Sequence, residues 1–319
     1  SDKITGFMKE TTIILIPVYN DWISLNKLLT ELEELLINRD KTHYQLLIIN
    51  DGSSEKPDIK SGKLLQVKII DLTANLGHQK AIAAGMSYIH HSIQCNNILI
   101  MDADGEDQPE DAIKLLDSAK SNPGNLIIGI RRKRNDGFSF RVYYLMYKLL
   151  FRILTGKRIS FGHFMVIPKK IADRLVYQSD IWNNLAATVL KTEITNTKIN
   201  TNKGFRYNGK SKMNFNSLLL HGLGAIAVFI ENIAVRLLTF SLMIIGLSSI
   251  IIIIILGIKW FTALAIPGWA SVILSTILIV LLQGFLLSLF TIFLFLSSQS
   301  YRKFIPARHY TDYIRENNY

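Results

Sequence analysis

Short apolar runs alternate with amphipathic stretches over residues 1–215 of the chain. Five runs have the composition of buried β-strands: "TIILIP", "YQLLIIN", "QVKIIDL", "NILIMD" and "NLIIGI". Between them, apolar residues recur at helical spacing in "WISLNKLLTELEELL", "HQKAIAAGMSYIHH" and "PEDAIKLLDSAK". Alternating strands and helices predict an α/β fold, with a mainly parallel sheet covered by helices on both faces. Such a sheet binds ligands at the carboxyl ends of its strands.

The hydropathy pattern changes in the last third of the chain. Residues 237–258 and 270–297 contain no charged residue, and each run is longer than the roughly 20 residues that cross a hydrocarbon core. A buried hairpin in a soluble protein is the alternative, but "IIGLSSIIIIIILGI" is too long and too continuously apolar for it. We therefore predict two transmembrane helices over 237–297, followed by a tail over 298–319.

The charge distribution predicts the orientation of these spans. The formal net charge is +11, but only Lys259 lies between the spans. Many cations precede the first span, and four follow the second: Arg302, Lys303, Arg308 and Arg315. Because cytoplasmic flanks carry the excess of Lys and Arg, both termini and the large first domain are expected in the cytoplasm.

An interfacial helix is expected at 216–236, leading into the first span. The stretch at about 138–155 combines apolar, aromatic and basic residues at helical spacing. This composition is typical of helices that lie in the headgroup layer of a membrane. A basic, aromatic helix face also suits nucleic acid. The membrane spans already explain it, and no stretch resembles a nucleic-acid-binding module, so we expect a membrane partner and no nucleic acid.

Polar motifs follow three successive predicted strands: "NDGSS", "ANLGHQK" and "DADGED". A "DGS" segment by itself is typical of a plain turn. Because parallel strands end at the same edge of a sheet, however, the motifs are expected to meet there. The residues that should converge are Asp51, Asn75, Gly77, Asp102 and Asp104.

The carboxylates of Asp102 and Asp104 are expected to point toward one locus. Such close carboxylates repel each other, and a hard divalent cation relieves the repulsion. Magnesium and manganese typically bind one or two protein carboxylates together with substrate phosphates, so the pair implies a diphosphate ligand. The later acids Glu110 and Asp111 instead suit the N-terminus of a helix that begins near Pro109.

The ordered motifs "IPVYN", "INDGSS", "NLGHQKAIAAG" and "MDADGEDQPE" resemble those of the family 2 glycosyltransferases, which have the Rossmann-like GT-A fold. Together with "GKSKM" at 209–213 and the two spans, the chain looks like the polyprenyl-phosphate glycosyltransferases, relatives of dolichyl-phosphate mannose synthase. The resemblance implies a GT-A domain over 1–215 at the cytoplasmic face of a bacterial-type inner membrane. It also implies inverting sugar transfer from a nucleoside diphosphate to an undecaprenyl-type phosphate, and homo-oligomers that assemble through membrane helices.

The resemblance also implies roles for individual residues. Asp102, Asp104 and Glu106 would bind Mg²⁺ or Mn²⁺, although the family often has glutamine where Glu106 stands. Asp51 would accept a hydrogen bond from the nucleotide base. The full set expected around the nucleotide is Pro17, Tyr19, Asn20, Asp51, Gly77, Lys80, Asp102 and Ala103.

A basic segment, "GIRRKRNDGFSFR", follows the fifth predicted strand, and "GKSKM" lies farther along the chain. Arginine binds phosphate through a planar fork, so the segment suits the leaving diphosphate or an anionic acceptor. A solvated loop or attraction to anionic lipid is the alternative for the first segment, and an ordinary glycine turn for the second. The residues expected to bind acceptor or diphosphate are Arg131, Arg134, Ser139, Arg141, Ser211 and Lys212.

His163 departs from the family pattern. Relatives commonly carry an aspartate in a "GDF" motif, where this chain has "FGHF". The histidine could act as a base near pH 7, bind an acceptor phosphate as a cation, or be a plain strand residue. With Asp104 and Arg131 it completes the set of residues expected to be catalytic.

His163 also keeps a second acceptor open, because a hydroxyl on a glycolipid or lipid-linked saccharide needs a base more than a lipid phosphate does. The chain lacks the QxxRW motif of processive polysaccharide synthases. A catalytically silent nucleotide-sugar-binding membrane module is a third hypothesis. The intact pair Asp102 and Asp104 favours an enzyme.

Overall fold

One seven-stranded sheet is the centre of the computed structural model, which describes residues 10–37, 39, 42–59, 66–131, 138–209, 215–261, 268–300 and 304–315. Its strands are β1 (Glu10–Val18), β2 (Thr42–Asn50), β3 (Gln66–Asp71), β4 (Asn97–Ile100), β5 (Leu126–Arg131), β6 (Met165–Pro168) and β7 (Asn196–Thr201). The spatial order is β3-β2-β1-β4-β6-β5-β7. The five predicted strands are confirmed, and β6 and β7 were not predicted.

Most neighbouring strands run parallel, as predicted. The exception is β6, which pairs antiparallel with both β4 and β5. The insertion of one reversed strand has a specific result: the residues that precede β6 lie beside the residues that follow β4. The predicted α/β class with a mainly parallel sheet is confirmed, and the sheet is mixed at this one position.

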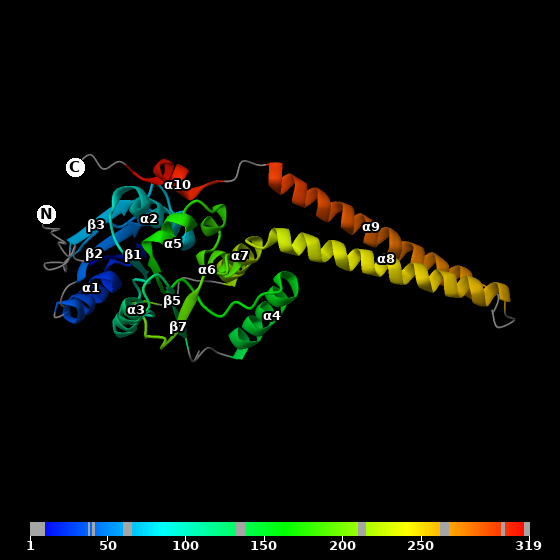
Figure 1. Ribbon diagram of the computed structural model, residues 1–319, viewed down its shortest axis with the longest axis horizontal. Helices are drawn as coiled ribbons and strands as arrows, with labels where there is room; N and C mark the ends of the chain where they lie inside the picture. Colours follow the sequence, from blue (N-terminus) through cyan, green and yellow to red (C-terminus); the bar gives the residue numbers. More distant parts are fainter. Residues whose placement is uncertain are drawn as a thin grey trace, which may run out of the picture. The chain divides into compact units, whose positions relative to one another are not determined.

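Helices flank the sheet (Figure 1), and further helices alternate with the strands or follow them along the sequence. They are α1 (Trp22–Leu36), α2 (His78–Ser92), α3 (Pro109–Ser121), α4 (Phe138–Thr155), α5 (Lys169–Leu175), α6 (Leu185–Lys191), α7 (Phe215–Ala227), α8 (Ile230–Phe261), α9 (Trp269–Ser300) and α10 (Pro306–His309). Two short 3-10 helices cover Ser179–Trp182 and Tyr310–Tyr313.

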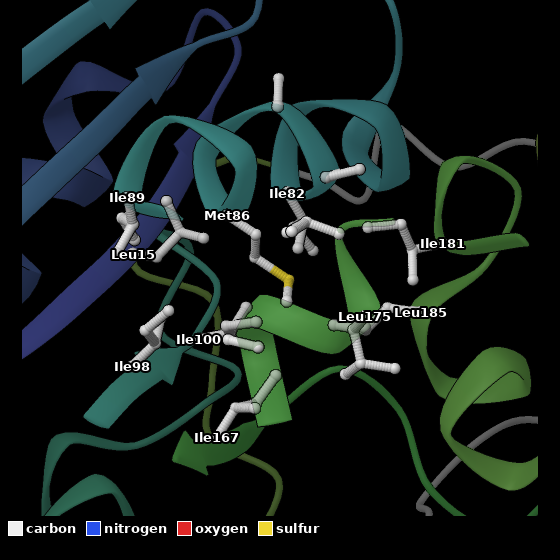
Figure 2. Packing of buried hydrophobic residues seen from close by; sticks show 14 of the residues in the cluster. Leu15, Ile82, Met86, Ile89, Ile98, Ile100, Ile167, Leu175, Ile181 and Leu185 are labelled. Atoms are coloured by element: carbon white, nitrogen blue, oxygen red, sulfur yellow. The ribbon is translucent and has the colours of Figure 1, made fainter. Parts of the chain in front are cut away.

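Alternate residues of the central strands enter two different hydrophobic cores. In β1, Ile13 and Leu15 pack in the core that includes α2, whereas Ile14 and Ile16 pack in the other core, with α1 and α3. This alternation is the period of two that a strand imposes on its side chains. Figure 2 shows the first core, where Met86 of α2 points toward the strands. Packing in the two cores fixes the positions of the strand ends. It therefore also fixes where the loops that follow the strands begin.

The chain divides into two compact units. The first contains the sheet and comprises Ser1–Leu149, Lys157–Val228 and Phe304–Tyr319; the second comprises Leu150–Gly156 and Phe229–Lys303. Residues near the C-terminus thus belong to the sheet unit, where α10 packs on α2. The stretch expected as one interfacial helix over 216–236 is divided, because α7 ends at Ala227 and α8 begins at Ile230.

In the second unit, α8 and α9 pack against each other and contain the two apolar stretches found in the sequence. Stretches over Ile230–Phe261 and Ser271–Ser297 are long and apolar enough to cross a membrane. Only 17% of each most apolar window is buried inside the protein, which is unlike the core helix of a soluble domain. The two helices therefore fit the predicted transmembrane hairpin.

Candidate functional site

Loops from the carboxyl ends of β1 and β2 are tied together by Asn20. Its backbone N–H donates to Ser53 Oγ at 2.9 Å, and its side-chain Oδ1 accepts from the backbone N–H of Ser54 at 2.9 Å. Asn20 has a φ of 49°, which asparagine tolerates better than most residues. The two loops are therefore held as one rigid surface at the edge of the sheet.

Asp51 connects the same surface to the loop after β3. Its two carboxylate oxygens accept hydrogen bonds from the backbone N–H groups of Leu76 at 2.8 Å and Gly77 at 3.0 Å. The next residue, Gly52, has a φ of 67°, and a Cβ there would lie 2.4 Å from the backbone carbon of Ala74. Only glycine permits this close approach. Asp51 and Gly77, both expected near the nucleotide, are thus in direct contact.

The register of β6 brings His163 to Asp102. Ile100, at the end of β4, pairs with Met165, at the start of β6, so the residues just beyond lie side by side. The Nε2 atom of His163 lies 2.9 Å from Asp102 Oδ1. His163 precedes β6 and is therefore not a plain strand residue.

A second histidine, which the sequence did not single out, joins this pair. His78 is the first residue of α2, and its Nε2 atom lies 3.4 Å from Asp102 Oδ1 and 3.3 Å from His163 Nε2. Its place in "NLGHQK", directly after the glycine that precedes a predicted helix, was the only signal in the sequence. The cluster of His78, Asp102 and His163 is called the imidazole cluster below.

The chain after β7 runs along the "DADGED" loop in the opposite direction. Asp107 and Lys203 form an antiparallel bridge, and the N–H groups of Gly204 and Tyr207 donate to the carbonyls of Glu106 and Asp104, both at 2.9 Å. This pairing brings in Arg206, which the sequence did not single out.

Arg206 neutralises the second aspartate of the motif. Its guanidinium donates to Asp104 Oδ2, and Asp104 Oδ1 accepts from the backbone N–H of Glu106 at 2.8 Å. The guanidinium Nε of Arg206 also lies 3.8 Å from Glu106.

Arg131, at the end of β5, binds the two acids that follow. It donates to Glu106 Oε2 at 3.1 Å and to Asp107 Oδ1 at 2.9 Å. Asp107 is buried, and its second oxygen accepts from the backbone N–H of Asp102 at 3.1 Å. The set Asp104, Glu106, Asp107, Arg131 and Arg206 is called the guanidinium cluster below.

The pKa values in the imidazole cluster are set by burial and by the contacts between its three side chains. Burial alone would raise the pKa of Asp102, but the imidazoles of His163 and His78 hold it well below the usual range. Burial opposes a charge on His163, yet the Asp102 carboxylate raises its pKa. Burial lowers the pKa of His78 to about 4, so this ring is neutral near pH 7.

In the guanidinium cluster the acids lie close to one another. Burial, with the nearby charge of Asp102, raises the pKa of Asp104 to about 6. Burial would lower the pKa of Arg131, but the carboxylates of Asp107 and Glu106 raise it. The cluster is therefore a network in which one buried and two half-buried acids are paired with arginines of the same chain.

A divalent cation fits one of these clusters better than the other. The sequence predicted Asp102, Asp104 and Glu106 as its ligands. In the structure, Asp104 and Glu106 have arginine partners, whereas Asp102 lies beside two imidazole nitrogens. Among the described residues, these three groups form the set of His and acid side chains whose donor atoms lie within 4.8 Å of one another. The site thus fits a divalent ion at Asp102.

The other predicted residues have varied positions. Pro17 and Ala103 are buried, Tyr19 is exposed, and the ammonium group of Lys80 lies 5.8 Å from the centre of the Trp182 ring. Three predicted residues lie outside the described part of the chain, and two lie in the first turn of α4. The former are Arg134, Ser211 and Lys212, and the latter are Ser139 and Arg141.

Comparisons with known proteins show the family to which the chain belongs. The model of glycosyl transferase family 2 matches residues 13–176. An uncharacterized glycosyltransferase of Bacillus subtilis (strain 168), YkcC, is 28% identical over 275 residues, which are 83% of this chain and 82% of that protein. A crystal structure described as that of a mycobacterial protein is similar with a TM-score of 0.50 and 10% identity, over 70% of this chain and 74% of that chain.

Glucosyl-3-phosphoglycerate synthase from Mycobacterium tuberculosis is similar with a TM-score of 0.48 and 11% identity, over 70% of this chain and 79% of that chain. Its crystal structure contains Mn²⁺ and uridine-diphosphate-glucose. Another crystal structure of that enzyme contains Mg²⁺ and uridine diphosphate.

The family match covers more than half of the chain, and it includes the strand-end loops, the aspartate motif and the strands from β2 to β6. The chain therefore belongs to glycosyl transferase family 2, and its sheet unit has the GT-A fold. As a member of this family it is a glycosyltransferase.

Proposed function

We propose that the protein is a metal-dependent inverting transferase. It moves a hexose-type sugar from a nucleoside diphosphate to a polyprenyl phosphate at the cytoplasmic face of a bacterial-type plasma membrane. The observation that carries the proposal is the combination, in one chain, of a family 2 sheet unit with two helices long and apolar enough to cross a membrane. A membrane anchor suits an acceptor that itself resides in the bilayer.

The loops at the edge of the sheet supply the donor site in this proposal. Asp51 already accepts two backbone N–H groups, and a carboxylate has further lone pairs for the N–H of a base. Tyr19, which is exposed directly after β1, would contribute an aromatic side chain to the nucleotide site. The nucleotide would then extend from Asp51 toward Asp102, with its diphosphate near the two clusters.

Asp102 would hold the divalent ion, with His78 and His163 beside it. Held at this position, the ion would supply positive charge next to the departing diphosphate. The ligand role of Asp104 stays a prediction, and it requires Arg206 to leave the Asp104 carboxylate. Arg131 and Arg206 contribute positive charge near the same group and hold the motif loop in place.

The acceptor decides how much base catalysis the site needs. A lipid phosphate is ionised near neutral pH and attacks the anomeric carbon without prior loss of a proton. The Nε2 atom of His163 is already held by Asp102, which suits a site that does not need this nitrogen as a free base. The second candidate, a hydroxyl acceptor, would require the other ring nitrogen, Nδ1 of His163, to act as the base while Asp102 orients the ring through Nε2.

A transfer assay tests the proposal. Purified full-length protein would receive Mn²⁺ or Mg²⁺, a panel of radiolabelled nucleotide sugars, and undecaprenyl phosphate, and the product would be extracted into organic solvent. We expect an acid-labile phosphosugar in the lipid phase. The signal should disappear with a chelator and in Asp102→Asn, but remain in Asp173→Asn. Asp173 is a matched control because it pairs with His90 in another part of the sheet unit.

Three other results would contradict the proposal. An acid-stable glycolipid formed with a hydroxyl acceptor would establish the second candidate. Donor hydrolysis without any lipid product would show that the acceptor is wrong. Donor binding without turnover across the whole panel would favour a silent nucleotide-sugar-binding module.

A further inference from the structure

The imidazole cluster consists of three potential metal ligands from three separate elements. His78 begins α2, Asp102 follows β4, and His163 precedes β6. Their donor atoms are 2.9, 3.3 and 3.4 Å apart. Each atom therefore lies within 3.4 Å of both others, and the three define a small triangle.

These separations match those of ligands on one ion. Donor atoms that bind a transition metal at about 2.1 Å, with angles between 90° and 110°, lie roughly 3.0–3.4 Å apart. Three such atoms occupy one side of an ion and leave the opposite side open to further oxygen ligands. Two histidines and one carboxylate in this facial arrangement are a known ligand set for divalent transition metals.

The contacts in the guanidinium cluster also argue against a magnesium site. Magnesium favours oxygen ligands in octahedral geometry. The oxygens expected to supply them, those of Asp104 and Glu106, face Arg206 and Arg131 instead. What is left beside Asp102 is nitrogen, and imidazole nitrogen suits transition metals far better than magnesium.

From this geometry we propose that His78, Asp102 and His163 form a facial two-histidine, one-carboxylate site that binds a divalent transition-metal ion in preference to Mg²⁺. The inference deepens the proposed function by naming the ligand set and the class of the ion. Part of it rests on that function, because the open side of the ion is assigned to the donor diphosphate. The metal site itself can be measured without any donor or acceptor.

Hydrogen bonding offers a different explanation for the same triangle. Two ring N–H groups that both donate to Asp102 Oδ1 would also lie about this far apart. In that case the cluster would only orient the side chains, and removal of one imidazole would not change the affinity for a metal. Metal affinity therefore separates the two explanations.

Direct binding of Co²⁺ is the test, because its visible absorption reports on coordination. The full-length protein would be purified in detergent without a polyhistidine tag and titrated with Co²⁺ by calorimetry and absorption, in the absence of nucleotide and lipid. We expect one ion per chain. His78→Gln and His163→Gln should each weaken binding by about tenfold or more, and Asp102→Asn should weaken it further.

The matched control is His90→Gln. His90 is also a histidine bonded to an aspartate, with its Nδ1 atom 2.6 Å from Asp173 Oδ1. This variant should bind Co²⁺ as the unmodified chain does. A large excess of Mg²⁺ should leave the Co²⁺ spectrum unchanged in both.

Failure of this inference can be distinguished from failure of the proposed function. Binding that is unaffected in His78→Gln and His163→Gln, displacement of Co²⁺ by equimolar Mg²⁺, or no binding at all would each overturn the metal site. Lipid-linked product formed with Mg²⁺ in His78→Gln at the rate of the unmodified chain would do the same, and would leave the proposed function intact. Co²⁺ binding with the expected pattern, but without sugar transfer, would keep the site and overturn the function.

Discussion

Asp102 and Asp104 are two residues apart in one motif, yet they have opposite surroundings. The imidazole cluster around Asp102 consists of side chains that can exchange a proton for a metal ion. The guanidinium cluster around Asp104 consists of arginines, which stay charged under all ordinary conditions. The difference teaches that the acids of a "DADGED" loop are not equivalent: Asp102 lies beside two imidazoles, and the others are paired with arginines.

The strongest way to test this comparison is to remove an arginine. Arg131→Met would leave Asp107 as a buried carboxylate without its charged partner, at a cost of about 3–5 kcal/mol in the free energy of unfolding. On the imidazole side, His78→Gln should cost no more than about 1 kcal/mol, because no buried charge loses a guanidinium partner there. Urea unfolding followed by tryptophan fluorescence measures both.

A double variant is the control for this prediction. Adding Asp107→Asn to Arg131→Met removes the unpaired charge and should restore much of the lost stability. If Arg131→Met and His78→Gln lowered the free energy of unfolding equally, the guanidinium cluster would not be the more important of the two for stability.

The second prediction concerns the close packing of the guanidinium side. Gly105 and Gly124 both have a φ of 85°, but a Cβ on Gly105 would lie 2.6 Å from the Tyr207 ring, whereas a Cβ on Gly124 would meet nothing within 4 Å. Gly124→Ala should cost about 1 kcal/mol through backbone strain alone. Gly105→Ala should cost about 2 kcal/mol more, because the ring must move.

The same unfolding experiment measures both glycine variants. The excess cost of Gly105→Ala should shrink when Tyr207 is replaced by leucine. If the two alanine variants lost similar amounts of unfolding free energy, the packing of Tyr207 on Gly105 would not contribute to the cost.

The smallest effect concerns a third carboxylate, which belongs to neither cluster. Burial raises the pKa of Asp51 to about 6, despite hydrogen bonds from Leu76 and Gly77. Between about pH 4 and pH 6 the folded protein then binds more protons at this site than the unfolded chain, so the contribution of Asp51 to stability falls as pH rises through that window. From pH 7 to pH 5, the unmodified chain should gain about 1 kcal/mol relative to Asp51→Asn.

Urea unfolding of the two proteins at both pH values tests this sign. The comparison of unmodified chain and variant cancels the titration of the other groups. The stability difference between the two proteins could instead stay constant with pH, or could shift toward Asp51→Asn at pH 5. Either result would show that burial does not raise the pKa of this carboxylate.

The hydrophobic pattern by itself determined most of the fold. Five strands and the long helices could be predicted because side chains with a period of two or 3.6 must face a core. The two missed strands lack that signal. β6 has only four residues, and β7, "NTKINT", alternates between exposed and half-buried positions, with only Thr201 buried. The apolar spans also followed from composition alone, since a bilayer requires length and hydrophobicity rather than specific contacts.

The candidate site could be predicted only in part, and the reason is distance along the chain. Asp51, Asp102 and Asp104 were found because strand-end loops of a parallel sheet meet at one edge. The partners of the two motif aspartates were decided by tertiary structure. His163 meets Asp102 across 61 residues because β6 is reversed, and Arg206 meets Asp104 across 102 residues because the chain after β7 pairs with the motif loop. Local patterns contain no information about such registers, which arise only when the whole sheet is packed.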